Sequence, residues 1–123
     1  AFDALLTALN PANRDWARDA AALVLVAAET ADAEGAPRRW AVYDAGQAAA
    51  HLTAQASALG LSVRQMGGFV ADDLPPLPER VVPLAVVAIG VAVPGDRIPE
   101  GHPATRLPAR ARRPLDELLL DVA

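Results

Sequence analysis

The fold is limited most strongly by one long amphipathic stretch, Arg38–Leu59, which is predicted to form a single helix. Its apolar residues recur at alternating spacings of three and four and form a narrow stripe, namely Val42, Ala45, Ala49, Leu52, Ala56 and Leu59. Alanines surround this stripe, so another backbone can approach the helix closely on more than one side. Gly60 follows where a helix end favours a residue that tolerates a positive φ. The short β-compatible segment Leu61–Met66 then leads directly into Gly67 and Gly68.

Two continuous apolar runs flank this unit, and each has the length of a buried strand. Ala20–Glu29 precedes the long helix, and Val82–Val93 follows the short strand; neither shows clean alternation of apolar and polar residues. Such runs are typical of strands that are buried on both faces. The sequence therefore predicts an α+β fold in which buried strands form a sheet and the long helix packs against it.

Shorter elements fill the rest of the chain. Phe2–Leu9 and Ala12–Asp19 are predicted helices, with Asn10 as a cap before the second one. A last short helix is expected to begin at Pro114. Surface connections are expected at three segments rich in proline, glycine or acidic residues: Thr30–Pro37, Asp72–Pro83 and Pro94–Pro108. No interdomain linker is visible, so residues 1–123 are expected to form one domain.

The start of the chain suggests that part of the fold is missing. Met66 is the only methionine, and the sequence begins at Ala1 inside helical sequence. Three strands and one long helix make a thin core for a self-contained fold. We therefore expect a fragment or a processed product, whose fold is completed by N-terminal elements or by a partner chain.

Composition excludes several kinds of chemistry. The 123 residues include no cysteine, which rules out disulfides, thiolate metal sites and cysteine nucleophiles. All eleven basic residues are arginines, so Schiff-base chemistry by lysine is excluded as well. With only two histidines, no metal centre is expected.

The charge and the hydropathy of the sequence limit the kinds of partner that the protein is expected to bind. The net charge of −4 argues against a general nucleic-acid binder. No apolar run is long enough to cross a bilayer, and no signal peptide is visible. We therefore expect a cytoplasmic protein that binds neither nucleic acid nor membrane.

Two features are candidates for ligand binding, and each has an ordinary structural alternative. Gly67 and Gly68 end a strand, where they form either a plain turn or a place where backbone N–H groups approach a cofactor. Arg110 and Arg112 lie two residues apart, so in an extended segment they point to one side. Two guanidinium groups so placed suit a phosphate, although a solvated basic stretch is the simpler interpretation.

Other residues give weaker signals. Trp16 and Trp40 are expected to pack in the core or at an interface. His51 is expected to be a hydrogen-bonded structural histidine. Tyr43 and Asp44 lie near the start of the long helix, where they either orient a ligand or stabilise the helix. No catalytic triad, paired carboxylates or nucleotide-binding glycine motif is present. A protein without obvious catalytic side chains can leave the chemistry to a cofactor.

Taken in order, these segments resemble the nitroreductase family of FMN-dependent oxidoreductases. The ordered matches are Asn13 with Trp16, then Tyr43-Asp44-Ala45-Gly46, Ala58-Leu59-Gly60-Leu61, Met66-Gly67-Gly68-Phe69, Ile89-Gly90 and Arg112-Arg113-Pro114-Leu115-Asp116-Glu117. The likeness spans nearly the whole chain. The arginine-rich motif with which the family begins has no counterpart here, so the chain resembles the C-terminal portion of such a protein.

The resemblance implies a three-layer α+β sandwich with a central mixed sheet, built as a homodimer with FMN at the subunit interface. It implies that the backbone of Met66, Gly67 and Gly68 faces the flavin ring, and that Arg110 and Arg112 bind its phosphate. No side chain of the protein would be catalytic. NAD(P)H would reduce the flavin, which would pass electrons to a nitroaromatic, a quinone or a similar small acceptor in a ping-pong reaction. The alternative is a non-catalytic dimer of the same fold that stores flavin or holds none.

Overall fold

The computed structural model describes residues 1–98, 100, 101 and 111–119. Its centre is a sheet of three strands, β1 (Ala22–Glu29), β2 (Ser62–Met66) and β3 (Val81–Gly90), in the order β1-β3-β2. The helices are α1 (Phe2–Ala8), α2 (Pro11–Ala17) and α3 (Ala41–Ala58). The α+β class expected from the sequence is confirmed.

The sheet differs from the mixed sheet that the family resemblance implied. Both pairings are antiparallel, Val24 opposite Val87 in one and Gln65 opposite Val87 in the other. The reason lies in the connection through α3, which leaves β1 and β2 running in the same direction but not adjacent. Because β3 fills the gap between them in the opposite direction, every contact among the described strands is antiparallel.

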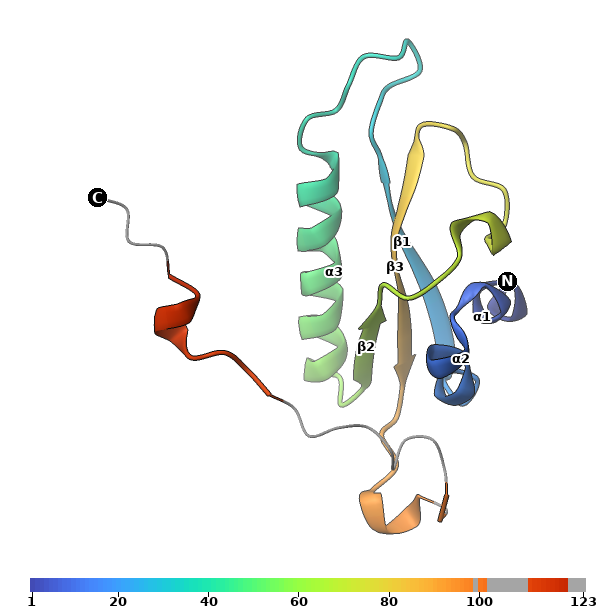
Figure 1. Ribbon diagram of the computed structural model, residues 1–123, viewed down its shortest axis with the longest axis vertical. Coiled ribbons are helices and arrows are strands. Elements are labelled where there is room, and N and C mark those ends of the chain that lie inside the picture. Colours follow the sequence, from blue (N-terminus) through green and yellow to red (C-terminus); the bar gives the residue numbers. More distant parts are fainter. Residues whose placement is uncertain (99, 102–110, 120–123) are drawn as a thin grey trace.

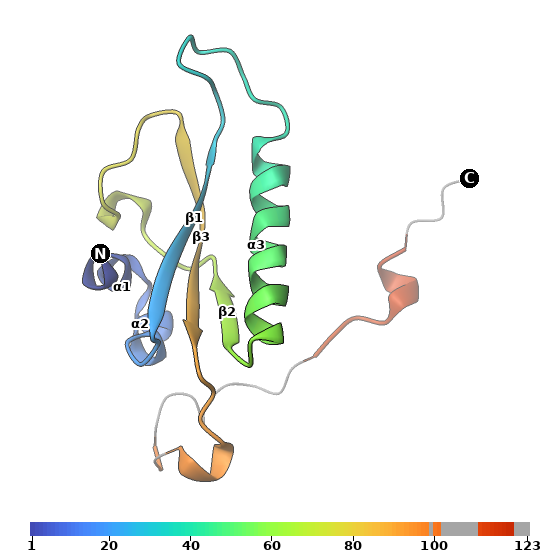
Figure 2. The ribbon, with the colours of Figure 1, turned by 180° about the vertical axis from the view of Figure 1, so that it is seen from behind.

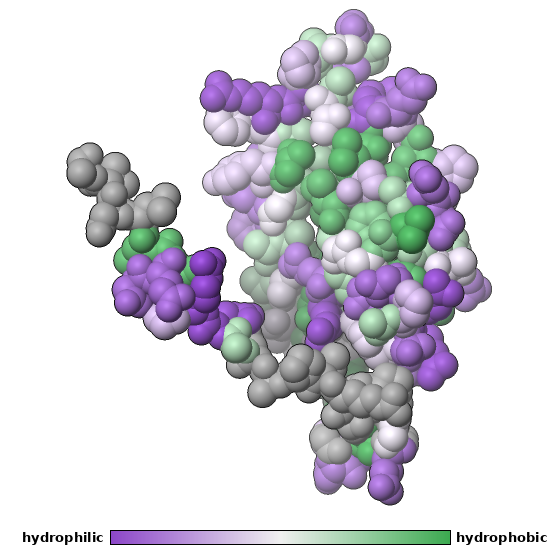
Figure 3. Space-filling model, in the orientation of Figure 1, coloured by the Kyte–Doolittle hydropathy of each residue, from purple (hydrophilic) through white to green (hydrophobic). Residues whose placement is uncertain are grey.

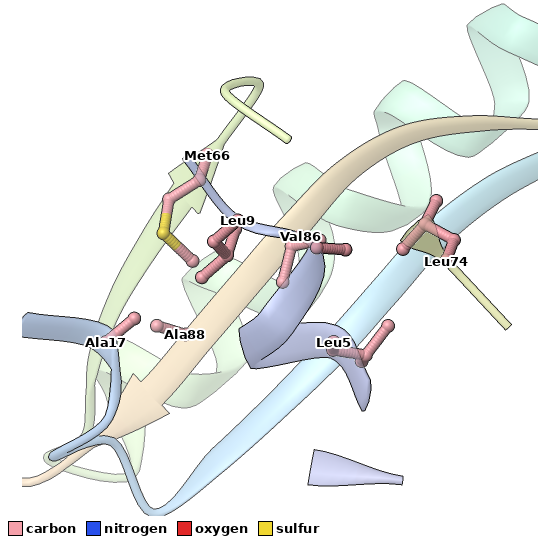
Figure 4. Close-up of a cluster of buried hydrophobic side chains, with 8 residues drawn as sticks. Leu5, Leu9, Ala17, Met66, Leu74, Val86 and Ala88 are labelled. Carbon is pink, nitrogen blue, oxygen red and sulfur yellow. The ribbon is translucent and has the colours of Figure 1, made fainter. Parts of the chain in front are cut away.

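Helices lie on both faces of the sheet. Figures 1 and 2, which are opposite views, place α3 on one face and α1 with α2 on the other. Successive residues of a strand point to opposite faces, so each strand supplies side chains to both layers. Figure 4 shows Val86 and Ala88 of β3 on the same face as Leu9 and Ala17.

The main buried cluster lies between the sheet and the α1–α2 layer. Leu9 and Val86 are fully buried at its centre, and Met66 from β2 closes one side (Figure 4). Leu74 also belongs to the cluster, although the sequence placed it in a surface connection. That connection begins with a short 3₁₀ turn, η1 (Ala71–Asp73), which directs Leu74 inward.

Helix α3 is shorter than predicted but lies where the pattern placed it. Ala49 and Ala56 of the predicted stripe are buried against the sheet, whereas Val42 and Leu59 are exposed at the two ends. Gly60, just past the helix, adopts φ +76°, as expected for a helix stop. The stripe therefore packs through its small middle residues.

The apolar strands are less buried than predicted. In β1 only Ala28 is fully enclosed, because the strand is at an edge of the described sheet and pairs with β3 alone. β3 ends at Gly90, and Val91 and Val93 beyond it are exposed. Pro83 is tolerated in the central strand because the register shifts there, opposite Ala27.

After β3 the described chain forms no long element. A 3₁₀ turn, η2 (Gly95–Arg97), is followed by the segment 111–119, which contains a second turn, η4 (Leu115–Glu117). The short helix expected from Pro114 is therefore a single 3₁₀ turn among the residues described. Most of the Pro94–Pro108 connection lies outside them. No helix in the described ranges is long and apolar enough to cross a membrane.

Candidate functional site

The double glycine packs against the junction between α1 and α2. The backbone N–H of Asn10 donates to the carbonyl of Gly68 at 3.0 Å, and Nδ2 of Asn13 donates to the same carbonyl at 3.2 Å. Two residues on, the N–H of Val70 donates to the carbonyl of Ala8 at 2.8 Å. The loop after β2 is thus fixed on its inner side by a short antiparallel bridge, with Leu9 opposite Phe69.

The two glycines have different surroundings. A Cβ at Gly68 would collide with the side-chain amides of Asn10 and Asn13, so packing within the protein itself requires a glycine there. A Cβ at Gly67 would meet no atom within 4 Å. Neither residue has a positive φ. Of these two glycines, only Gly67 faces open space, and no contact within the described fold requires a glycine there.

The loop also offers hydrogen-bond donors. Outside the strand ladder, its bonds to the described fold use the carbonyl of Gly68 and the N–H of Val70. The N–H groups of Gly67 and Gly68 are not engaged by those bonds. Backbone donors on an open loop can bind the acceptor atoms of a flat ligand. Met66 contributes only its backbone, because its side chain is buried in the core.

The α1–α2 junction is rigid for local reasons. Asn10 caps α2, since its Oδ1 accepts from the N–H of Asn13 at 2.9 Å, as the sequence predicts for the Asn-Pro pair. Arg14 donates from Nη2 to the carbonyl of Leu9 at 2.9 Å. No sequence pattern connects Asn13 with Gly68, which is 55 residues away along the chain. These two residues are close because α2 packs beside β2.

Of the two predicted phosphate-binding arginines, the structure describes only Arg112, and it does not bring this residue to the glycine loop within one chain. Arg112 is exposed, and its Nη1 donates to the carbonyl of Ala111 at 3.0 Å. Figures 1 and 2 show the segment 111–119 leading away from the sheet and helices. Arg110 lies outside the described residues.

The same segment exposes a group of leucines. Figure 3 shows it standing clear of the body, with apolar and polar residues side by side. Leu115, Leu118 and Leu119 have exposed fractions of 69%, 50% and 65%. Neighbouring apolar side chains this exposed form an apolar patch on the surface of the described chain.

A pocket of about 540 Å³ lies at the other end of β2 from the glycine loop. Its walls come from α2, from β2 and from the end of β3 with the residues that follow, and they include Trp16, Val63, Ile89 and Val93. The guanidinium of Arg64 lies 5.2 Å from the centre of the Trp16 ring, a cation–π contact that joins α2 to β2. Neither Gly67 nor Gly68 lines this pocket.

A second group of polar residues lies near the start of α3. Glu29 binds Arg80 (Nε to Oε1, 2.6 Å) and Arg38 (Nη1 to Oε2, 3.2 Å). The hydrogen bond from Arg80 and the charge of Arg38 lower the pKa of Glu29 from its ordinary value. Trp40 and Tyr43 are exposed and meet edge to face, with ring centres 6.4 Å apart. This group ties the ends of β1 and β3 to the approach to α3, and we read it as structural.

Among the described residues, no group of three or more His, Cys, Asp or Glu side chains is arranged to hold a metal ion. His51 is exposed on α3. The glycine loop therefore remains the candidate site.

Known proteins are similar to this chain in sequence and in structure. One is a protein of Mycolicibacterium smegmatis, described as an uncharacterized 15.4 kDa protein in the 5′ region of ask; it is 38% identical over 87 residues, which cover 69% of this chain and 58% of that protein. Another is the crystal structure of an oxidoreductase containing FMN; it superimposes with a TM-score of 0.77 at 28% identity, over 94% of this chain and 62% of that one. No protein-family model matches the chain. The chain thus spans less than two thirds of the length of each similar protein.

Proposed function

We propose that the protein is an FMN-dependent oxidoreductase of the nitroreductase type. The observation that carries the proposal is the open side of the Gly67-Gly68 loop, where a Cβ at Gly67 would meet nothing within 4 Å. The solved structure that resembles this fold is an oxidoreductase that contains FMN. A flat ligand at this loop would account for the missing side chain at Gly67.

The loop residues would act by binding and orientation. The N–H groups of Gly67 and Gly68 would donate to acceptor atoms at the ring edge, and the glycine at position 67 would allow the ring to approach the backbone. Met66, buried beneath, would keep the loop in place. When bound, FMN supplies hydride and electron transfer that the side chains of this protein cannot provide.

The phosphate would be bound by Arg110 and Arg112, which suit it by charge and by the fork of the guanidinium group. Since Arg112 is separated from the loop within one chain, we propose that the site is completed by a partner chain or by elements beyond the described residues. A homodimer satisfies this requirement. The exposed leucines of the segment 111–119 and the alanine-rich outer face of α3 support such an association.

The proposed reductant is NAD(P)H, and the proposed acceptors are nitroaromatics, quinones or similar small molecules. One site would serve reductant and acceptor in turn, which is a ping-pong reaction. The alternative is a dimer of the same fold that binds flavin without turning over, or holds none.

Two measurements on the intact protein test the proposal. Purified protein should show the absorbance bands of flavin, and NAD(P)H should be consumed when a quinone or a nitroaromatic is added. Flavin bands without consumption would favour the flavin-storing alternative. Protein that neither retains nor takes up FMN would refute the proposal.

A paired substitution tests the phosphate contact. Replacing Arg110 and Arg112 together by alanine should sharply reduce the FMN retained after purification, because the phosphate loses its cationic partners. Arg39→Ala is the control. It also removes an arginine, but Arg39 lies over the ring of Trp40, near the start of α3, and has no proposed role at the phosphate. Unchanged flavin content in the double variant would exclude this role for the two arginines.

A further inference from the structure

We propose that Asn13 is a positioning residue for the flavin-binding loop. Its side-chain amide fixes the carbonyl of Gly68 on the inner side of the loop and so directs the N–H of Phe69, in the same peptide group, outward, where it can donate to the ligand beside the N–H groups of Gly67 and Gly68. The inference rests on the proposed function, and it assigns a role to a side chain that need not touch the flavin.

The geometry places two donors on one carbonyl. The oxygen of Gly68 accepts from Nδ2 of Asn13 at 3.2 Å and from the backbone N–H of Asn10 at 3.0 Å. The contact between the loop and the α1–α2 junction continues through the bridge that pairs Leu9 with Phe69. In this bridge the N–H of Val70 donates to the carbonyl of Ala8. The inner edge of the loop is therefore held at both ends of a short antiparallel bridge.

Fixing this carbonyl also fixes the donor on the other side of the same peptide group. A trans peptide is planar, so the N–H of Phe69 points away from the direction of the Gly68 carbonyl. In the bridge, the bonds are made by the residues that flank Phe69, which leaves its own N–H on the outer side. Hydrogen bonds accepted by a carbonyl polarise the peptide and strengthen its N–H as a donor.

Among the groups that hold the loop, Asn13 is the one that substitution can remove selectively. Asn10 contributes its backbone N–H to Gly68, while its side-chain oxygen caps α2. A change at Asn10 would therefore disturb the helix and the loop together. The side chain of Asn13 binds the loop alone, since the cap uses only its backbone N–H.

The test replaces Asn13 in the intact protein. It measures the binding and the reduction potential of the flavin in one set of experiments and the hydrogen exchange of the loop contact in another. Asn13→Asp keeps the size of the side chain but loses the donor and places a carboxylate beside the Gly68 carbonyl. FMN should bind about tenfold more weakly or worse, the effect of losing one well-placed hydrogen bond. The reduction potential of the bound flavin should become more negative, because weaker N–H donors stabilise its electron-rich reduced form less.

The control is Arg14→Ala. Arg14 binds the carbonyl of Leu9 in the same junction without touching Gly68, so this variant should lose stability but keep the FMN affinity and the potential. Asn13→Ala, measured in parallel, removes the donor without adding a charge and takes the place of Asn13→Asp should the latter fail to fold.

A readout without flavin separates this inference from the proposed function. In the flavin-free protein, the amide of Asn10 should exchange its hydrogen faster in the Asn13 variants, because the carbonyl that it contacts has lost one of its two donors. Unchanged exchange and unchanged FMN binding in folded variants would overturn the role of Asn13. Faster exchange in a protein that never binds FMN would leave the loop contact standing and refute the flavin role.

Discussion

At the scale of single residues, the two adjacent glycines are required for different reasons. Gly68 is required by the amides of Asn10 and Asn13, whereas Gly67 faces open space. A side chain at position 68 therefore disturbs the fold, and one at position 67 disturbs only what approaches from outside.

Alanine at each position separates these roles. Gly68→Ala should destabilise the flavin-free protein by about 1–3 kcal/mol, because the new Cβ displaces two packed amides. Gly67→Ala, the matched control, should change the free energy of unfolding by less than about 0.5 kcal/mol. Urea unfolding followed by circular dichroism measures both. Equal losses in the two variants would contradict the assignment.

Glu29 gives a prediction about pH. Its pKa is lowered in the folded protein by the hydrogen bond from Arg80 and by the charge of Arg38. A carboxyl with a lowered pKa stabilises the fold above its unfolded pKa, near the ordinary value of 4.5, and loses that contribution as the pH falls through the folded pKa.

Glu29→Gln should therefore be less stable than the wild type at pH 7, and the difference should shrink below about pH 4. Unfolding free energies of both proteins between pH 3 and pH 7 test this, with Glu34→Gln as a control on an exposed loop. A difference that is constant over the whole range would show that the ion pairs are not responsible.

At the scale of elements, the sheet and the α1–α2 layer depend on a small set of large side chains. Leu9 is fully buried between α1 and β3, whereas Leu119 is 65% exposed. Leu9→Ala should cost about 2–5 kcal/mol of unfolding free energy, since it leaves a cavity in the core. Leu119→Ala, the same substitution at an exposed position, should cost less than about 0.5 kcal/mol in the flavin-free monomeric chain. Similar losses would mean that the core lies elsewhere.

Elements with local signals were predicted well. The cap at Asn10 and the positive φ of Gly60 depend on residues that are close in sequence, and both are confirmed. The stripe of α3 is confirmed in its middle, where Ala49 and Ala56 are buried, but not at its ends. The strand order and the antiparallel pairing were not predicted, because the position of β3 between β1 and β2 depends on contacts between distant segments.

The candidate site likewise has a part that could be predicted from the sequence and a part that could not. The strand end at Gly67-Gly68 could be found from the sequence, since a glycine pair after a short strand is a local pattern. The contact from Asn13 to Gly68 could not, because it joins residues 55 positions apart. The burial of Leu74 escaped prediction for the same reason, as it depends on how η1 packs against α1.

At the scale of the whole molecule, we propose that the flavin site is completed by a second copy of the chain. The segment 111–119, which contains Arg112, leads away from the sheet and helices (Figure 1), and the outer face of α3 exposes small residues such as Ala50 and Ala54. A close contact between two copies along α3 would bury this face.

Ala54→Arg tests that contact. The substitution places a long charged side chain on the outer face of α3, so it should convert a dimer to a monomer with the helix content unchanged. Ala33→Arg, on an exposed loop, adds the same charge and should leave the dimer intact. Sedimentation velocity measures the mass of each variant. A dimer that survives Ala54→Arg would place the interface on another surface.

FMN titration of the intact protein tests most directly whether Gly67 borders an FMN site. We predict saturable binding of one FMN per chain, and binding at least about tenfold weaker in Gly67→Val, with the unfolding free energy of the flavin-free protein nearly unchanged. Equal FMN affinity in the wild type and in Gly67→Val, or no binding by either, would contradict the account.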